Sequence, residues 1–136
     1  MLVVIDTGVS TTKVAAMVNG SMVCFRYPSA VLRGIANEQA GGVYCIGKTT
    51  ANFQIYSVLA DGNGVISTSA QGFRDPANPR RRILLEHALA KVAIVGKTNI
   101  ILTQPAHVIF RGGENHTDTL RDIEANLLRM SVSRID

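Results

Sequence analysis

The sequence predicts an α/β fold: a mixed β-sheet that begins with an N-terminal β-meander and is flanked by helices. Turn residues divide the N-terminal part into short apolar runs, which is typical of consecutive strands. Two later segments, residues 79–91 and 117–130, have the apolar spacing of helices. A continuous apolar run at residues 99–102 lies between them and indicates a strand buried on both faces. This order of strands and helices predicts helices packed on a sheet.

The meander is predicted from one strong turn signal. Asn19-Gly20 separates two strand-like runs, and this dipeptide favours a type I′ hairpin because both residues tolerate a positive φ. Pro28 closes the last run, since proline cannot donate to a strand ladder. The expected strands are residues 2–6, 12–18 and 21–26.

The segment after the meander carries weaker signals. Residues 27–42 have no clean period, so we expect an irregular connection there, followed by a short strand at residues 43–46. Residues 53–59 and 65–69 flank Asp61-Gly62-Asn63-Gly64, whose residues favour turns. This pattern predicts a second hairpin.

The first helix is expected to begin at Pro79 and to run to about Lys91, because Asn78 can cap it and proline suits the first helical position. The residues 80–82 are three arginines in its first turn. We expect them on a solvated basic face or, alternatively, against an acidic patch of a neighbouring molecule. The expected buried stripe is Ile83, Leu84, His87 and Ala88.

The second helix is expected from Thr117 to Met130, with Asn115 as a plausible cap. Its apolar residues recur at helical spacing and predict one buried face. They are Leu120, Ile123, Leu127 and Leu128.

Composition narrows the class of protein. A chain of 136 residues with 46% hydrophobic residues predicts a single domain, residues 1–136, and aromatic residues at 5% predict an aliphatic core. The net charge of +4 favours acidic partners, nucleotides included, and is too small to indicate a DNA-binding surface. Cys24 and Cys45 are expected as buried, reduced thiols, and the three histidines have no ligand spacing for a metal.

We expect a cytoplasmic protein without a membrane contact. The first apolar run is interrupted by Asp6 and has no basic leader, unlike a signal peptide. No apolar stretch reaches the roughly 18 residues that a membrane span needs.

Candidate binding residues follow the first apolar run directly. Asp6 ends the run and can orient water or Mg²⁺, while Gly8 allows the backbone to turn tightly beside an anion. Lys13 supplies a positive charge for phosphate. Hydroxyl or backbone donors to phosphate oxygens would come from Ser10, Thr11 and Thr12.

These residues have three alternative interpretations. A Walker A loop requires Gly-Lys-Ser/Thr at the start of a helix, and here a strand follows Lys13, which excludes it. Asp6-Thr7-Gly8 also resembles the signature of retroviral-type aspartic proteases, although in that family more strands precede the aspartate. A third interpretation is an acid and a lysine that only end two strands in a polar loop.

The spacing of Asp6, Gly8 and Lys13 resembles the first phosphate loop of the actin-like ATPases, and above all that of the plasmid-partitioning ParM/StbA family. Thr103-Gln104-Pro105 after the buried strand resembles a turn of the same proteins. Within the first helix, His87-Ala88-Leu89 resembles the corresponding helix of ParM relatives. The resemblance implies an RNase H-like sheet flanked by helices. It implies ATP and Mg²⁺ as ligands, with Asp6 as catalytic residue and as metal contact through water. It also implies filament subunits as partners and plasmid DNA reached only through an adaptor protein.

The sequence departs from that family in one respect. The resemblance implies a second Asp-x-Gly loop and a Gly-rich adenosine motif, and neither occurs in these residues. We therefore expect the chain to correspond to the N-terminal subdomain, subdomain I, and to be inactive as an ATPase alone. The alternative is an actin-like interaction module that binds itself or a full-length subunit.

Overall fold

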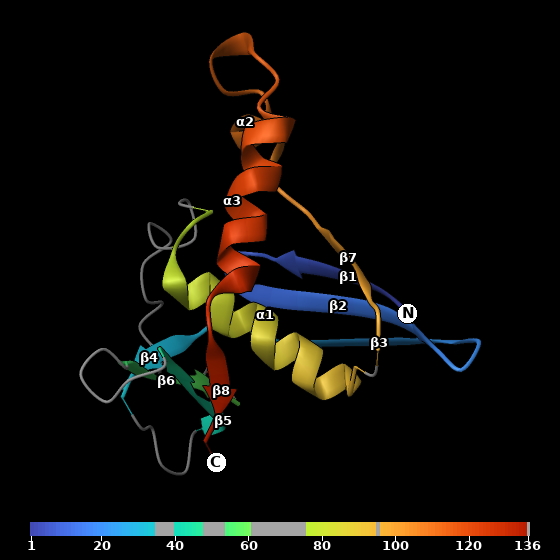
Figure 1. Cartoon of the computed structure of the whole chain (residues 1–136), viewed down its shortest axis with the longest axis vertical. Helices are drawn as coiled ribbons and strands as arrows, with labels where there is room; N and C mark the ends of the chain where they lie inside the picture. The colour runs from blue at the N-terminus through green and yellow to red at the C-terminus, as the bar shows by residue number, and fades with distance from the viewer. Residues whose placement is uncertain (35–39, 48–53, 61–75, 95, 136) are drawn as a thin grey trace.

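The computed structural model of the chain describes residues 1–34, 40–47, 54–60, 76–94 and 96–135 (Figure 1). Its strands form two four-stranded sheets. Sheet A has the order β3-β2-β1-β7 and contains β1 (Leu2–Thr7), β2 (Thr11–Val18), β3 (Ser21–Pro28) and β7 (Asn99–Leu102). Sheet B has the order β4-β6-β5-β8 and contains β4 (Val31–Arg33), β5 (Ala40–Ile46), β6 (Gln54–Leu59) and β8 (Val132–Arg134). The helices are α1 (Pro79–Val92), α2 (Ala106–Ile109) and α3 (Thr117–Arg129), and a 3-10 turn, η2 (Arg111–Gly113), follows α2.

The predicted meander is confirmed in sheet A. β1 pairs antiparallel with β2, and β2 pairs antiparallel with β3. The turn between β2 and β3 has positive φ at Asn19 (51°) and Gly20 (78°), as a type I′ turn requires. β7 joins the other side of β1 in parallel, so the sheet is mixed, as expected.

Both long helices begin where their sequences predict. The Asn78 side chain accepts a hydrogen bond of 2.9 Å from the Arg80 backbone N–H, and Pro79 takes the first helical position. Asn115 accepts a hydrogen bond of 2.9 Å from the Thr117 N–H at the start of α3. The predicted stripe of α1 is buried, because this helix lies across one face of sheet A (Figure 1). No helix in the described part of the chain is long and apolar enough to cross a membrane.

A single apolar cluster joins the two sheets and the helices. It includes Val3 and Val14 of sheet A, Val58 of sheet B and Leu84 of α1. Polar rings also lie inside it: the Tyr27 hydroxyl donates to the Leu84 carbonyl, and the Tyr44 hydroxyl shares a 2.6 Å hydrogen bond with His87 Nδ1. The face of sheet A that packs on α1 is called the inner face below, and the opposite face is called the outer face.

The predicted strand at residues 99–102 is confirmed, but the prediction that it is buried on both faces is wrong. The strand exists, but β7 lies at the edge of sheet A, and Ile101 on the outer face is 50% exposed. On the inner face Ile100 and Leu102 are half-buried, so no residue of β7 is fully buried. Continuous apolar sequence therefore overestimated the burial here.

The arginines of α1 also differ from the prediction of a solvated basic face. Arg81 and Arg82 are 2% and 6% exposed, respectively, and each is paired with a carboxylate, Arg81 with Glu124 and Arg82 with Glu86. Buried guanidinium groups need such partners because an unpaired charge is costly away from water. The two pairs explain why arginine is tolerated at the start of a packed helix.

Three further expectations are corrected or lie outside the described residues. The stretch expected to be irregular contains β4 and the beginning of β5, which pair with β6 in sheet B. Cys24 is exposed on the outer face and Cys45 is half-buried, so the expectation of two buried thiols is wrong for Cys24. β6 confirms the first strand of the predicted second hairpin, whereas its turn at residues 61–64 and its second strand at residues 65–69 lie outside the described residues.

Candidate functional site

The candidate site forms where β1 and β7 end. Because these two strands are parallel, their carboxyl ends meet at the same edge of sheet A. Asp6 lies at the end of β1, and Thr103 follows the last residue of β7. The Thr103 hydroxyl donates a 2.7 Å hydrogen bond to Asp6 Oδ1. The second carboxylate oxygen of Asp6 has no protein partner in the described ranges, so it can accept a hydrogen bond from water or a ligand.

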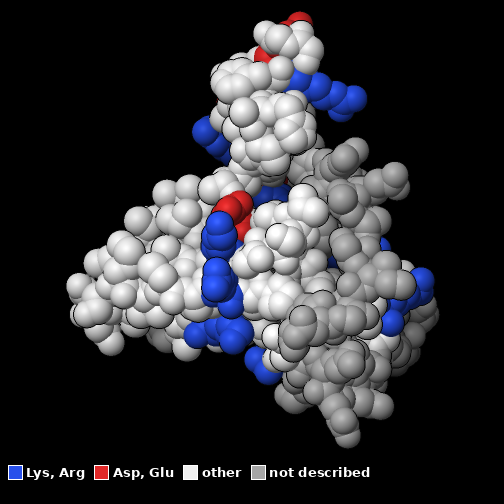
Figure 2. All heavy atoms as spheres, turned by 180° about the vertical axis from the view of Figure 1, so that it is seen from behind, with Lys and Arg blue, Asp and Glu red and all other residues white. Residues whose placement is uncertain are grey.

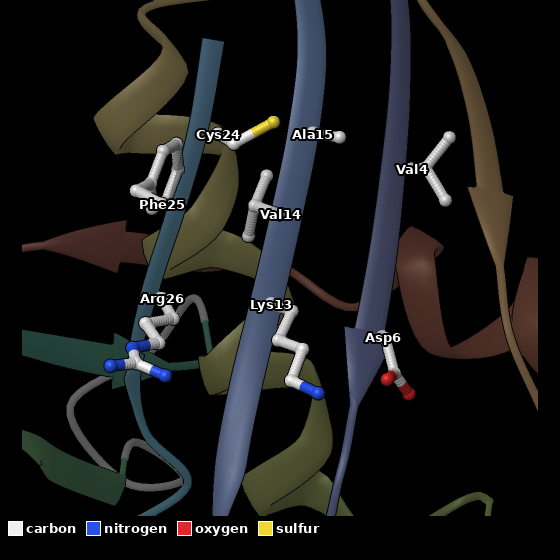
Figure 3. A pocket seen from close by; sticks show the side chains of 8 residues that line it. All are labelled: Val4, Asp6, Lys13, Val14, Ala15, Cys24, Phe25 and Arg26. Atoms are coloured by element: carbon white, nitrogen blue, oxygen red, sulfur yellow. The ribbon is translucent and has the colours of Figure 1, made fainter.

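Two cations lie beside Asp6 in one row across the sheet. Strand register places Lys13 of β2 opposite Asp6 and Arg26 of β3 opposite Lys13. Both side chains are exposed, and neither forms an ion pair with Asp6 or any other described acid. The row therefore offers a ligand two positive charges and one negative charge at the same end of the strands (Figure 3).

A hollow of about 520 Å³ lies on the outer face next to this row. Figure 3 shows the charged side chains at one end of it, with apolar side chains and Cys24 along the strands. Its lining residues are Val4, Asp6, Lys13, Val14, Ala15, Cys24, Phe25 and Arg26. One end of the hollow is thus suited to an anion and the other to an apolar group.

Gly8 is required by close packing in the loop between β1 and β2. A Cβ at this position would lie 2.6 Å from the Thr11 carbonyl oxygen, closer than a side chain can approach. The backbone φ of Gly8 is not in the left-handed region, so contact distance and not conformational freedom explains the glycine. The tight turn was predicted, and the structure supplies this different reason for it.

The predicted hydroxyl donors separate into two groups. Ser10 is exposed in the turn between the strands, and Thr11, the first residue of β2, is half-buried. Thr12 is fully buried on the inner face, where its hydroxyl shares a 2.8 Å hydrogen bond with Ser29. The Thr12 side chain therefore points away from Asp6 and Lys13, which corrects its role as a hydroxyl donor.

Several residues around the loop were not identified as site residues from the sequence. Arg81 donates from Nε to the Thr7 hydroxyl at 2.9 Å and forms an ion pair with Glu124, which also accepts a hydrogen bond from Gln104. Thr103 and Gln104 could have been found, because polar residues that follow parallel strands converge at one edge. Arg81 gave no such signal, since it is one of three consecutive arginines.

A magnesium ion bound together with phosphates fits this site better than an ion held by protein alone. Within the described ranges, no group of three or more His, Cys, Asp or Glu side chains could hold a metal. Mg²⁺ commonly takes one or two carboxylates and completes its octahedron with phosphates and water. The free oxygen of Asp6 is suited to such a contact, through water.

Figure 2 shows the molecule from the side away from α1. Basic side chains form a column in the middle of this face, beside an acidic side chain, and a broad area next to them carries no charge. The outer face of sheet A has exposed apolar residues: Leu2 and Met17 are each 41% exposed, and Met22 is 67% exposed. An apolar surface of this kind on a sheet face favours contact with a partner.

Comparisons with known proteins support the fold. No family model and no curated protein matches the sequence. Among solved structures, the chain is similar to AlfA from the B. subtilis plasmid pLS32, which was solved as a filament, with a TM-score of 0.55 and 16% sequence identity. The similarity covers 96% of this chain and 48% of the AlfA chain, so the chain spans about half the length of that protein. The chain therefore has a mixed α/β fold that is similar to about half of the AlfA chain.

Proposed function

We propose that this chain is the N-terminal, phosphate-contacting subdomain of an actin-like, filament-forming ATPase of plasmid partitioning, of the ParM/StbA type, with an RNase H-like sheet. The observation that carries the proposal is the arrangement at the end of β1. A carboxylate fixed by Thr103 lies beside two cations, Lys13 and Arg26, that form no ion pair with a described acid, next to a tightly closed loop. The fold shared with AlfA supports the same assignment.

In this proposal each residue has a distinct role toward ATP and Mg²⁺. Lys13 contacts phosphate oxygens as a point charge, and Ser10 and Thr11 donate hydrogen bonds to them. Asp6 orients a water molecule of the magnesium ion, which itself neutralises charge on the phosphates. Gly8 keeps the backbone close enough for these contacts.

The chain alone is proposed to bind phosphate without turning over ATP. Phosphoryl transfer depends on charge stabilisation and positioning from several directions. The described residues at this site provide one carboxylate and two cations, all from one edge of one sheet. Contacts from the remainder of an AlfA-like protein would be needed to close the site.

Titration of the purified chain with Mg-ATP tests the proposal. Lys13→Ala and Asp6→Asn should each weaken binding by about tenfold or more, since each removes a charged contact. Lys97→Ala is the matched control, because it removes the same charge at the opposite end of β7, where Asn99 pairs with Leu2. Equal affinities of the Lys13 and Lys97 variants would refute the assignment of phosphate contacts to Lys13.

A second candidate function, an actin-like interaction module that binds itself or a full-length subunit, is favoured by the apolar outer face. Met22 is 67% exposed and Ile101 is 50% exposed on this face, and exposed apolar surface favours contact with a partner. Binding of Mg-ATP separates the two functions: a chain that associates and binds no nucleotide is the module. The aspartic-protease alternative has no comparable support, because Asp6 is engaged by Thr103 of its own chain.

A further inference from the structure

We propose that Arg81 is a positioning residue for the loop between β1 and β2, acting through Thr7 and Glu124. The proposal rests on the proposed function in one respect: it treats this loop as the phosphate-binding element. Its structural part, that Arg81 fixes the loop, can be tested without any ligand.

Arg81 reaches the loop from the side opposite to the candidate ligand. Asp6 and Thr7 are consecutive in β1, so their side chains point to opposite faces of sheet A. Asp6 lies on the outer face in the charged row, whereas Thr7 points to the inner face and accepts the 2.9 Å hydrogen bond from Arg81 Nε. A contact on the inner face therefore fixes the backbone that presents the carboxylate on the outer face.

The contacts of Arg81 form part of a closed ring around the strand ends. Glu124 of α3 receives both the ion pair from Arg81 and a hydrogen bond from Gln104. Gln104 is the neighbour of Thr103, which holds Asp6. The ring runs through Arg81, Thr7, Asp6, Thr103, Gln104 and Glu124 and then back to Arg81.

The ring ties four separate elements to the loop. Arg81 belongs to α1, Thr7 ends β1, Gln104 follows β7 and Glu124 belongs to α3. Two of its buried atoms, Arg81 Nη2 and Glu124 Oε2, have no hydrogen-bond partner among the described residues. A buried ion pair with unsatisfied atoms is an inefficient source of stability, because apolar residues of similar volume often serve as well or better. Fixing the geometry of the loop is a role that apolar residues could not fill.

Arg82 provides a matched control on the same helix. It is a neighbouring arginine, is also buried, and pairs with Glu86 at 2.7 Å. Its other hydrogen bond goes to the Met130 carbonyl and does not involve the loop. A substitution of Arg82 thus disturbs a buried ion pair of α1 without touching Thr7.

Amide hydrogen exchange of the unliganded chain is the primary test. Two amides report on the loop: the Thr103 N–H donates to Ile5 and the Ser29 N–H donates to the Ser10 carbonyl. The Asn99 N–H, which donates to Met1 at the other end of sheet A, is the internal reference. Thr7→Val keeps the shape of the side chain and removes the hydroxyl, so it should speed exchange at Thr103 and Ser29 about tenfold relative to Asn99.

The conservative variants separate positioning from general stability. Thr7→Ser keeps the hydroxyl and should restore slow exchange. Arg81→Lys should have the same effect as Thr7→Val. Arg82→Lys should leave the exchange rates of Thr103 and Ser29 relative to Asn99 unchanged. The proposal would be overturned if Arg81→Lys raised the exchange rate equally at all three amides and by the same factor as Arg82→Lys. It would also be overturned if the Thr7→Val chain exchanged like wild type.

Nucleotide binding is then compared in the same variants. If wild type binds Mg-ATP, Thr7→Val should weaken binding more than Arg82→Lys does, and Thr7→Ser should restore it. If wild type does not bind Mg-ATP while the exchange results are as expected, the proposed function fails and the positioning role of Arg81 stands. If wild type binds and the exchange ratios do not change, the positioning role fails alone.

Discussion

Gly8 shows how one residue determines whether the candidate site can form. The loop closes so tightly that the Thr11 carbonyl oxygen occupies the space of a side chain at this position. Replacement would have to push the two strand ends apart, and these ends carry Asp6 and Lys13. The glycine is thus needed because of the position of Thr11, which a local sequence pattern alone does not reveal.

Gly8→Ala should therefore disturb the loop more than the addition of a single methyl group suggests. We expect a loss of about 1–3 kcal/mol in the free energy of unfolding, the range for added volume in a packed site, together with weaker Mg-ATP binding. Val9→Ala in the same loop is the control, because Val9 is 52% exposed and should be replaceable at little cost. Urea unfolding measures the first effect, and an unchanged midpoint for Gly8→Ala would contradict the packing argument.

Tyr27 gives a prediction about pH. Burial, and to a lesser extent the nearby Tyr44, raise the pKa of the Tyr27 hydroxyl above its ordinary value of 10.0. The folded chain keeps this proton where the unfolded chain loses it, so this contribution to stability is present below pH 10 and is lost as the pH rises above it. Above pH 10, titration of Tyr27 lowers the free energy of unfolding by up to about 1.4 kcal/mol per pH unit.

The difference in stability between wild type and Tyr27→Phe should show this effect of pH. Near neutral pH the variant loses the hydrogen bond to Leu84 and should be less stable by about 1–2 kcal/mol. It lacks the titrating group, so the gap to wild type should narrow at about pH 10.5. Urea unfolding at both pH values measures the gap, and a gap that widens would show that the sign is wrong.

At the scale of elements, the start of α1 is important because it carries Arg81 to the loop. Asn78→Ala removes the cap on this helix and should lower the free energy of unfolding by about 1 kcal/mol. Asn78→Ser should recover most of the loss, since a serine oxygen can accept the same hydrogen bond from Arg80. A serine variant as unstable as the alanine variant would indicate that Asn78 acts in another way.

Elements specified by local chemistry were predictable from the sequence. The turn at Asn19-Gly20 and the cap at Asn78 each involve neighbours in the chain, so their residues indicate them directly. The edge position of β7 was not predictable in this way, because it depends on which strands pair and on what covers the outer face. For the same reason the sequence did not indicate that β4, β5, β6 and β8 form a second sheet.

The same distinction applies to the residues of the candidate site: those close in the sequence were predictable, and those brought together by strand register and helix packing were not. Asp6, Gly8 and Lys13 lie in one hairpin and were identified from their spacing. Arg26 was missed although it lies directly across from Lys13, because only the register of β2 and β3 makes it a neighbour. Arg81 and Glu124 depend on the packing of two helices, and their pairing follows only from the tertiary structure.

At the scale of the whole molecule, the outer face of sheet A predicts self-association of the purified chain. Light scattering at micromolar concentration should show species larger than 14.6 kDa that dissociate on dilution. Met22→Glu combined with Ile101→Glu should give a single species of that mass, because charge on this face prevents apolar contact.

Phe110→Glu is the control for that experiment. Phe110 is 56% exposed, comparably to Ile101, but it lies after α2 and away from sheet A. Its variant should associate as wild type does. A wild-type chain that remains a single 14.6 kDa species on dilution would show that the outer face does not mediate association.

The hydrogen bond between Asp6 and Thr103 also has a consequence for the order of folding. It joins residues 97 positions apart, and parallel pairing of β1 with β7 closes a loop of similar length. Contacts of such long range form slowly, since the entropy of loop closure is lost before they contribute. During synthesis the meander can form as soon as β3 has left the ribosome, but Asp6 acquires its partner only after Thr103 has emerged. A nascent chain would therefore hold a folded meander with an unfinished candidate site until Thr103 has emerged.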